Sequence, residues 1–485
     1  MGVATFEPRD LPRVLSLRAQ RQPDATALVF EGHSHSCAAL SVRADSIAST
    51  LWHAWGVRPG DRVAWLGLNH ADQLALLFAL ARIGAMLLPL NFRLAPAEWD
   101  TLVAECAPRH LVFDANFADA GAALGARHGV AVHELASLAG GSDRAAPDHA
   151  SPQAAALLVA TSGTTSRPKI AMHTQGNLLA NMRIAAEVQR ITPDDRVLTV
   201  LPLFHVGGLC IQTLPALFAG AQVVLHPRFT PEATFDALAE HRPTLTLQVP
   251  ATMKALVEHP RWPAAALDSL RAVWAGSSLL PASLIEAFHA RGVPVCNVYG
   301  ATETGPFSIA LPPEHAFDHV GSCGWPAPGV EVRLENGEVL LRADNEVHRY
   351  WPDLPARDAE GWFHTGDLAT LAADGSYSIV GRAKDLIISG GENIHPAEIE
   401  SPLSEHPAVL ECCAFGMPDP AWGEAVAVAV VLRPGAQVGD DELREHLAAR
   451  LARFKLPRHW LRLQALPKTA LGKVQRQSLP ALLVR

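Results

Sequence analysis

The segment TSGTTSRPK, residues 161–169, follows the apolar run AALLVA at residues 155–160. An apolar run of this length that ends in small polar residues is typical of a buried strand followed by a loop. Small hydroxyl residues around Gly163 let backbone N–H and side-chain O–H groups approach a polyphosphate, and Lys169 adds a positive charge. The segment predicts a phosphate-binding loop, and a polar surface loop is the alternative that the same residues allow.

The spacing of this segment resembles the P-loop of Walker NTPases, but two positions differ from that motif. Pro168 stands where the motif has its second glycine, and Ile170 stands where it has the serine or threonine that binds magnesium. A Walker NTPase is therefore not expected.

Composition sets the broad class of the protein. The chain has 485 residues, 49% of them hydrophobic, which is enough for about three compact units. Its formal net charge of −9 argues against a nucleic-acid-binding surface. No apolar run reaches bilayer length and the first ten residues lack a secretory signal, so we expect a cytoplasmic protein with no integral membrane association. The 7 cysteines form no CxxC pair and indicate reduced thiols.

The order of patterns along the chain predicts an α/β fold. Helical patterns alternate with short apolar runs in two series, residues 11–114 and 155–312, as expected for largely parallel sheets. After residue 321, short alternating segments predict a small β-rich unit. The last hundred or so residues have strand and helix patterns of their own, which is enough for a separate domain. We place the boundary between Ala383 and Lys384.

Four further segments combine an apolar strand pattern with a polar or glycine-rich turn. Ligands of α/β folds bind where such turns leave the carboxyl ends of the strands. The segments are PLFHVGG (202–208), AGSSLL (275–280), VYGATETG (298–305) and GWFHTGD (361–367).

Together with GRAKDLIISGGENIHPAEIE (381–400) and PKTALGKVQR (467–476), these motifs resemble the adenylate-forming (ANL) superfamily of acyl- and aryl-CoA synthetases, luciferases and peptide-synthetase adenylation domains. The motifs occur in that family's order and cover nearly the whole chain. The resemblance implies a large N-terminal region of two α/β subdomains plus a small β-rich unit, residues 1–383, and a mobile C-terminal α+β lid, residues 384–485. It also implies that ATP and Mg²⁺ convert a carboxylic acid to an acyl-adenylate, which coenzyme A then converts to a thioester.

The resemblance assigns nucleotide contacts to individual residues. The phosphates would contact Thr161, Ser162, Gly163, Thr164, Thr165 and Lys169. Tyr299 would stack on adenine, and the base would be lined by Gly276, Ser277, Ser278 and Gly300. Asp367 would accept both ribose hydroxyls, and Arg382 would reach the same ribose.

Catalysis and domain movement are assigned in the same way. Thr302 and Glu303 would bind the α-phosphate and magnesium, with Thr161 also near the metal. Lys473 would neutralise charge during adenylation, Lys384 would be the hinge, and Gly391 would line the pantetheine tunnel.

The predicted acyl pocket is small and uncharged. Its candidates are His205, Val206, Gly207, Ala275, Gly276, Gly300 and Ala301. Because none of them is Arg or Lys, we expect a fatty or aryl acid without a second carboxylate. A homodimer is compatible with the sequence.

Two other functions stay open at this point. The acyl group could pass to a carrier-protein thiol, although the basic residues Arg453, Lys455, Arg458 and Arg462 favour coenzyme A. A catalytically silent sensor of acyl groups or nucleotides is suggested by Ser166 and Ile170, which replace glycines usual in the family loop, while retention of Lys473 argues against it.

Overall fold

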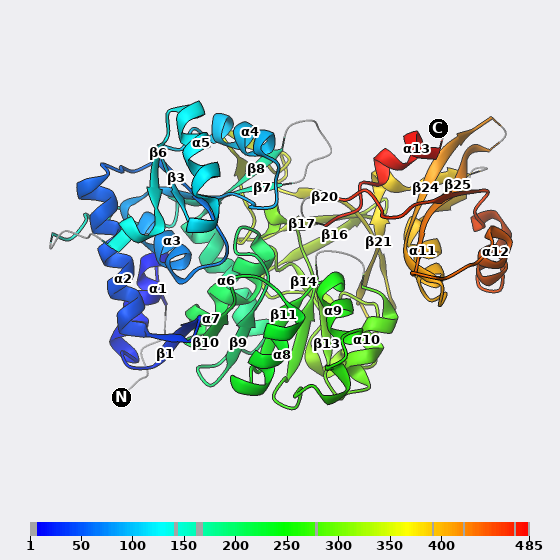
Figure 1. Cartoon of the computed structure of the whole chain (residues 1–485), viewed down its shortest axis with the longest axis horizontal. Coiled ribbons are helices and arrows are strands. Elements are labelled where there is room, and N and C mark those ends of the chain that lie inside the picture. The colour runs from blue at the N-terminus through cyan, green and yellow to red at the C-terminus, as the bar shows by residue number, and fades with distance from the viewer. Residues whose placement is uncertain are drawn as a thin grey trace.

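The computed structural model describes residues 7–139, 144–161, 168–276, 280–389, 392–420, 422–469 and 472–483. Its described residues form two large sheets with helices between and around them, a small β unit, and a C-terminal body that lies at the right-hand end of Figure 1. This arrangement confirms the predicted α/β class. Within the described residues, no helix is both long enough and apolar enough to cross a membrane.

The first sheet carries the strand that precedes the predicted phosphate loop. Its central strands are parallel, and strand β8 turns back antiparallel to β7. In spatial order the strands are β19 (Leu354–Pro355), β18 (Arg349–Tyr350), β8 (Lys169–Thr174), β7 (Ala155–Thr161), β4 (Met86–Pro89), β3 (Arg62–Leu66), β5 (His110–Phe113) and β6 (Ala131–Glu134).

The second sheet is parallel from β13 to β1, with antiparallel edges. Its central strands are short and fully buried, as expected for strands covered on both faces. In spatial order they are β15 (Trp325–Pro326), β14 (Ile309–Ala310), β13 (Val295–Tyr299), β12 (Ala272–Ala275), β11 (Leu245–Gln248), β9 (Arg196–Thr199), β10 (Gln222–Leu225), β1 (Thr26–Phe30) and β2 (His33–Ser36).

Three groups of helices cover these sheets. The shared core between the sheets contains residues of α1 (Leu11–Arg21), α2 (Cys37–Ser49), α3 (Ala71–Ile83), α6 (Gln175–Val188) and α7 (Leu214–Ala219). A second core lies under α4 (Pro96–Cys106) and α5 (Ala118–His128). A third lies under α8 (Pro231–Glu240), α9 (Pro250–Val257) and α10 (Ala282–His289).

The two sheets do not follow the two series that the sequence predicts. Strands β1 and β2 come early in the chain but join the second sheet, where Leu28 pairs with Val223 of β10. Strands β7 and β8 come from the second series and join the first sheet, where Leu157 pairs with Leu87. The apolar run at residues 155–160 forms a strand as predicted, but apolar patterns contain no information about which sheet a strand joins.

The small β unit has four antiparallel strands, in the order β16 (Glu331–Glu335), β17 (Glu338–Arg342), β20 (Phe363–Leu371) and β21 (Tyr377–Arg382). Asn336 and Gly337 join the first two strands with φ of 51° and 85°, the left-handed values that a tight hairpin turn requires. This unit confirms the predicted β-rich segment.

The C-terminal body has its own apolar cores. Lys254 of α9 donates a 2.9 Å hydrogen bond to the carbonyl of Leu410, and Glu258 pairs with Arg433 at 3.0 Å. The boundary at 383/384 stays a prediction. The elements of this body are β22 (Ile387–Ser389), β23 (Glu392–Ile394), β24 (Val409–Asp419), β25 (Gly423–Leu432), β26 (His459–Arg462), α11 (Pro396–Ser404), α12 (Asp440–Ala448) and α13 (Leu479–Leu483).

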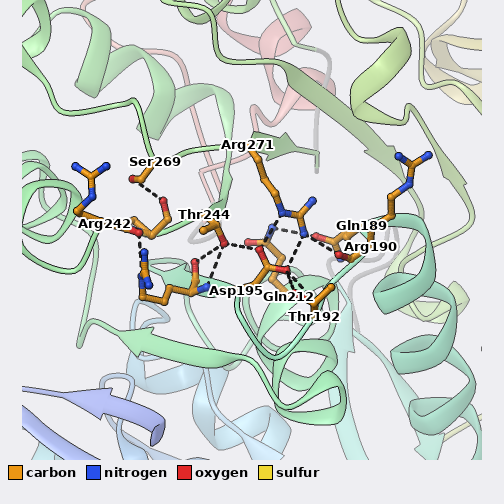
Figure 2. Close-up of polar contacts among 11 residues, drawn as sticks. Gln189, Arg190, Thr192, Asp195, Gln212, Arg242, Thr244, Ser269 and Arg271 are labelled. Carbon is orange, nitrogen blue, oxygen red and sulfur yellow. Dashed lines mark hydrogen bonds and ion pairs between the residues drawn. The ribbon is translucent and has the colours of Figure 1, made fainter. Parts of the chain in front are cut away.

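A buried carboxylate joins the amino ends of three strands in the second sheet (Figure 2). Asp195 precedes β9 and accepts hydrogen bonds from Arg271, which precedes β12, at 2.9 and 3.0 Å. It also accepts from Thr244, which precedes β11, at 2.6 Å and from the N–H of Thr192 at 2.8 Å. Burial acts to raise the pKa of Asp195, but these hydrogen bonds outweigh it and lower the pKa. The network fixes the end of the sheet opposite to the predicted site.

We expect Asp195→Asn to lower the free energy of unfolding by about 2–4 kcal/mol, because it leaves a partly buried Arg271 without its charge partner. Urea denaturation measures the change. The control is Asp268→Asn, whose pair with Arg242 is exposed on both sides and should contribute much less, because water screens it. Equal losses in the two variants would contradict a special role for Asp195.

Candidate active site

The predicted site residues lie where strands end. Thr161 ends β7, Ala275 ends β12 and Tyr299 ends β13, while His205 follows β9. Because β9, β12 and β13 run parallel in the second sheet, their carboxyl ends present loops at one edge of that sheet, whereas Thr161 ends a strand of the first sheet. Seven of the predicted site residues lie outside the described residues, so their contacts remain predictions. They are Ser162, Gly163, Thr164, Thr165, Ser277, Ser278 and Gly391.

Asp367 is the centre of one polar group. It lies in β20 directly opposite Arg382 of β21, whose Nε is 2.9 Å from its Oδ1. The hydroxyl of Tyr299 donates to its Oδ2 at 2.9 Å. Burial and the charge of Asp367 raise the pKa of Tyr299, so this phenol is a neutral donor. The structure thus brings Asp367 together with Tyr299, which lies 68 positions earlier in the chain and which the sequence connects with Asp367 only through the family motifs.

Glu303 is the centre of a second polar group. It lies in the short 3₁₀ turn η6 (Thr302–Thr304), which ends at Gly305 with φ of 94°. Burial raises the pKa of Glu303, while the hydroxyl of Tyr350, Lys169 and Arg382 oppose the rise. Tyr350 donates to Oε1 of Glu303 at 3.0 Å.

Lys169 reaches this group from the first sheet. It begins β8 opposite Thr161, and the Thr161 hydroxyl donates to the Lys169 carbonyl at 3.1 Å. The Lys169 ammonium lies 4.9 Å from the centre of the Tyr350 ring. Lys169 and Glu303 are therefore gathered around one aromatic side chain.

Lys473 brings the C-terminal body to the same place. It lies on a turn where its N–H donates to the Thr469 hydroxyl at 3.2 Å. The residue is exposed, but protein atoms crowd its ammonium and lower its pKa, as does the positive charge of Arg382. The negative charges of Asp367 and Glu303 oppose this shift. The side chain is thus within electrostatic reach of both carboxylate groups.

His205, a candidate for the predicted acyl pocket, lies just before the π-helix η4 (Gly207–Thr213). Its Nδ1 accepts a 3.0 Å hydrogen bond from the N–H of Gly207, the first residue of that helix. Burial and, to a smaller extent, the charge of Lys473 lower the pKa of His205 to about 4. The imidazole is therefore neutral near pH 7. Val206 and Gly207 are buried beside it.

The small residues of the predicted pocket have a second explanation. A Cβ at Gly300 would lie 1.8 Å from the carbonyl oxygen of Pro306, and one at Gly276 would lie 2.7 Å from that of Val298. Glycine is needed at both positions because two backbone segments approach closely, so backbone packing alone accounts for Gly276 and Gly300. The Ala275 methyl packs in the core under α9 and α10. Pocket lining by these residues and by half-buried Ala301 stays a prediction.

The predicted hinge residue Lys384 is exposed in the 3₁₀ turn η8 (Ala383–Asp385). Its pKa is lowered by partial burial and by Arg382. The next residue, Asp385, is tied to the C-terminal body because Arg476 pairs with it at 2.9 Å and with Glu400 at 2.7 Å. The residue that directly follows Lys384 is therefore already fixed to the C-terminal body.

Tyr350 is the residue that sequence reasoning missed. It lies in a two-residue strand that gives no periodic signal. The chain has 3 tyrosines, and two of them donate to carboxylates of this site, so the rarity of tyrosine is the one signal that could have drawn attention to it.

The donor set suits a hard cation bound together with phosphate. Glu303 supplies a half-buried carboxylate. Thr302, the preceding residue, and Thr161, at the end of β7, supply hydroxyl oxygens. Among the described residues, no cluster of three or more His, Cys, Asp or Glu side chains could hold a metal on its own. Magnesium fits this arrangement because it is commonly bound by one or two carboxylates together with substrate phosphates and water.

Comparisons with known proteins identify the family of the chain. Residues 15–347 match the family model described as AMP-binding enzyme, and residues 398–473 match that of the AMP-binding enzyme C-terminal domain. The chain is 40% identical to an indoleacetate–CoA ligase of Aromatoleum aromaticum, with 98% of each chain covered. It is 39% identical to a feruloyl-CoA synthase of an Amycolatopsis species, covering 94% of this chain and 96% of the relative.

A solved structure shows the same fold. The o-succinylbenzoate CoA synthetase of Bacillus subtilis, in complex with its acyl-adenylate intermediate, superposes with a TM-score of 0.88 at 31% identity, and 98% of each chain is covered.

Proposed function

Because the chain belongs to the AMP-binding enzyme family, as an ATP-dependent ligase that joins a carboxylic acid to coenzyme A through an acyl-adenylate, we propose that its substrate is an aryl acid with one carboxylate. The observation that carries the catalytic assignment is the pair of polar groups in which Tyr299 donates to Asp367 and Tyr350 donates to Glu303. The charge of Lys473, from the C-terminal body, acts on both carboxylates. The neutral environment at His205 supports the substrate class. A homodimer stays a prediction.

The first half-reaction joins the acid to AMP. The acid's carboxylate oxygen attacks the α-phosphorus of ATP, an acyl–phosphate bond forms, and pyrophosphate leaves with the electron pair of the broken P–O bond. Asp367 accepts the ribose hydroxyls in place of its present bond from Tyr299, whose ring lies beside the base. Lys169 and Lys473 offset the negative charge that develops on the phosphate and carboxylate oxygens.

Glu303, with Thr302 and Thr161, would hold magnesium, which when bound supplies positive charge to the phosphate oxygens. The carboxylate form of Glu303 is the one that binds a cation. Because burial raises its pKa, the hydrogen bond from Tyr350 matters for keeping it ionised.

The second half-reaction needs a different arrangement of the C-terminal body. The coenzyme A thiolate attacks the acyl carbonyl, a thioester bond forms, and AMP leaves. In the present arrangement, Lys473 is the residue that offsets the negative charge of the adenylation transition state. We therefore place the thiol's approach after rotation at Lys384, which brings the Gly391 segment to the site.

A panel of acids tests the substrate class. Indole-3-acetate and ferulate, the acids in the names of the two relatives, should release AMP with kcat/KM at least about 100-fold above sulfoacetate and 2-succinylbenzoate. The reason is that a second charge would be buried without a partner beside neutral His205. A coupled AMP-release assay measures this ratio. The control is hexanoate, whose tail is uncharged and not aromatic. Preference for either doubly charged acid would contradict the proposal.

Lys473→Ala tests the two-arrangement mechanism. Acyl-adenylate formation should slow by about 100-fold, because a charge that acts in the first transition state is removed. Thioester formation from supplied acyl-adenylate should be nearly normal. Lys384→Pro should show the opposite pattern, because proline restricts the backbone rotation at the hinge.

The matched control for this test is Lys468→Ala, which removes a lysine from the same turn that pairs instead with Glu411. It should leave both half-reactions unchanged. Equal slowing of both half-reactions in Lys473→Ala would refute the mechanism.

An exposed aromatic patch on the C-terminal body is our candidate for the nucleotide end of coenzyme A. Trp422 is 42% exposed and Phe454 43% exposed, and the Arg458 guanidinium lies 4.4 Å from the centre of the Trp422 ring. Flat aromatic rings beside a guanidinium suit an adenine base and its phosphates. The predicted basic cluster is smaller than the sequence implies, because Lys455 pairs with Glu398 and Arg462 with Asp440.

We expect Trp422→Ala to raise the KM for coenzyme A about tenfold, the loss typical of one base–aromatic stack. Acyl-adenylate formation, measured without coenzyme A, should be unchanged. Phe317→Ala is the control, since that ring is also exposed, at 48%, but lies in the N-terminal part. An unchanged KM would remove the patch from the coenzyme A site.

A further inference from the structure

We propose that Tyr350 is a positioning residue for adenylation: its hydroxyl orients the Glu303 carboxylate and its ring holds the Lys169 ammonium before ATP binds. The inference rests on the proposed roles of Glu303 and Lys169 at the metal-bound triphosphate. In this inference Tyr350 contacts neither ATP nor the acid, and acts through Glu303 and Lys169.

The position of Tyr350 is fixed by the fold and not by a ligand. Tyr350 lies in β18, where its backbone pairs with Ala171 of β8, two residues after Lys169. The residue is 6% exposed, so its hydroxyl has little access to water as an alternative partner. Its bond to Glu303 is charge-assisted when Glu303 is ionised, which makes it stronger than a bond between neutral groups.

The segment around Tyr350, which we call the strap (residues 344–350), also fixes the backbone of the Glu303 turn. The N–H of Val347 donates to the Glu303 carbonyl at 2.8 Å. The fully buried Asn345 amide donates to the carbonyls of Thr304 at 2.9 Å and Phe307 at 3.1 Å.

The strap is itself anchored to a helix. Asn177 of α6 donates to the carbonyl of Asp344 at 2.9 Å. One segment therefore determines both the position of the Glu303 backbone and the rotation of its carboxylate.

This arrangement prepares both groups for the triphosphate. One oxygen of Glu303 accepts from Tyr350, which turns the other oxygen toward a cation, and such orienting bonds typically change metal affinity 10–100-fold. The ring contact leaves the charge of Lys169 unneutralised, whereas an ion pair with Glu303 would engage both groups before ATP arrives. The strap thus keeps a cation and an anion close together and available.

Tyr350→Phe removes the hydroxyl and retains the ring. We expect the Kd of Mg·ATP, measured by calorimetry without the acid, to rise about tenfold, because one charge-assisted hydrogen bond is lost. The Kd of AMP measured in EDTA should stay within about twofold, since AMP without metal relies on the base and ribose contacts around Tyr299 and Asp367. Tyr377→Phe, the third tyrosine, at the far end of β21, should leave both Kd values unchanged.

Glu303→Gln separates this inference from the proposed function. If Glu303→Gln weakens Mg·ATP and Tyr350→Phe does not, the inference is overturned and the role of Glu303 stands. If Glu303→Gln leaves Mg·ATP binding unchanged, the proposed metal role of Glu303 fails and the inference fails with it.

Two further outcomes decide whether Tyr350 acts through Glu303. The double variant Tyr350→Phe/Glu303→Gln should bind Mg·ATP no more weakly than Glu303→Gln alone, because the hydroxyl then has no carboxylate to orient. Independent, multiplying losses would overturn the inference. Equal weakening of Mg·ATP and of AMP in EDTA by Tyr350→Phe would also overturn it, because it would show a general structural role.

Discussion

The charge of Glu303 is balanced by groups that come from distant parts of the chain. Burial disfavours the ionised carboxylate, and Lys169 and Arg382 favour it, with Tyr350 as its hydrogen-bond donor. Lys169 comes from β8 and Tyr350 from the neighbouring β18 of the first sheet, and Arg382 comes from the small β unit. A carboxylate in this position is stable only when all these elements are assembled, so folding and the preparation of the site are the same event.

The second sheet divides stability and chemistry between its two ends. At the amino ends of its strands, Asp195 has its oxygens filled by Arg271, Thr244 and Thr192 (Figure 2). At the carboxyl ends, Asp367 and Glu303 each have phenol donors that a ligand hydroxyl or a cation can replace or join. A fully satisfied network resists exchange, whereas a partly satisfied one can accept a substrate.

The sequence predicts the elements better than their assembly. The central strand Ala272–Ala275 is a continuous apolar run, so its burial can be read directly from the sequence. Strand β1 joins the second sheet through the pairing of Leu28 with Val223, which lies 195 positions later (223 − 28). Tyr350 reaches Glu303 across 47 positions. Local patterns contain no record of such pairings. The motif residues Asp367, Arg382 and Tyr299 are predicted from the resemblance to the family motifs, whereas the contacts of Asp367 with the other two could not be foreseen.

The contacts between the C-terminal body and α9 explain how the body can hold Lys473 in place and still move. Glu258 and Arg433 are each more than 40% exposed, so their ion pair contributes at most about 1 kcal/mol. The bond from Lys254 to the Leu410 carbonyl adds a contribution of similar size, because water can replace the carbonyl. By contrast, each part has its own buried core, which the proposed rotation at Lys384 would leave intact. A ligand that binds one arrangement more tightly by a few kcal/mol can therefore shift the body between its positions, and ATP and coenzyme A are large enough to supply that difference.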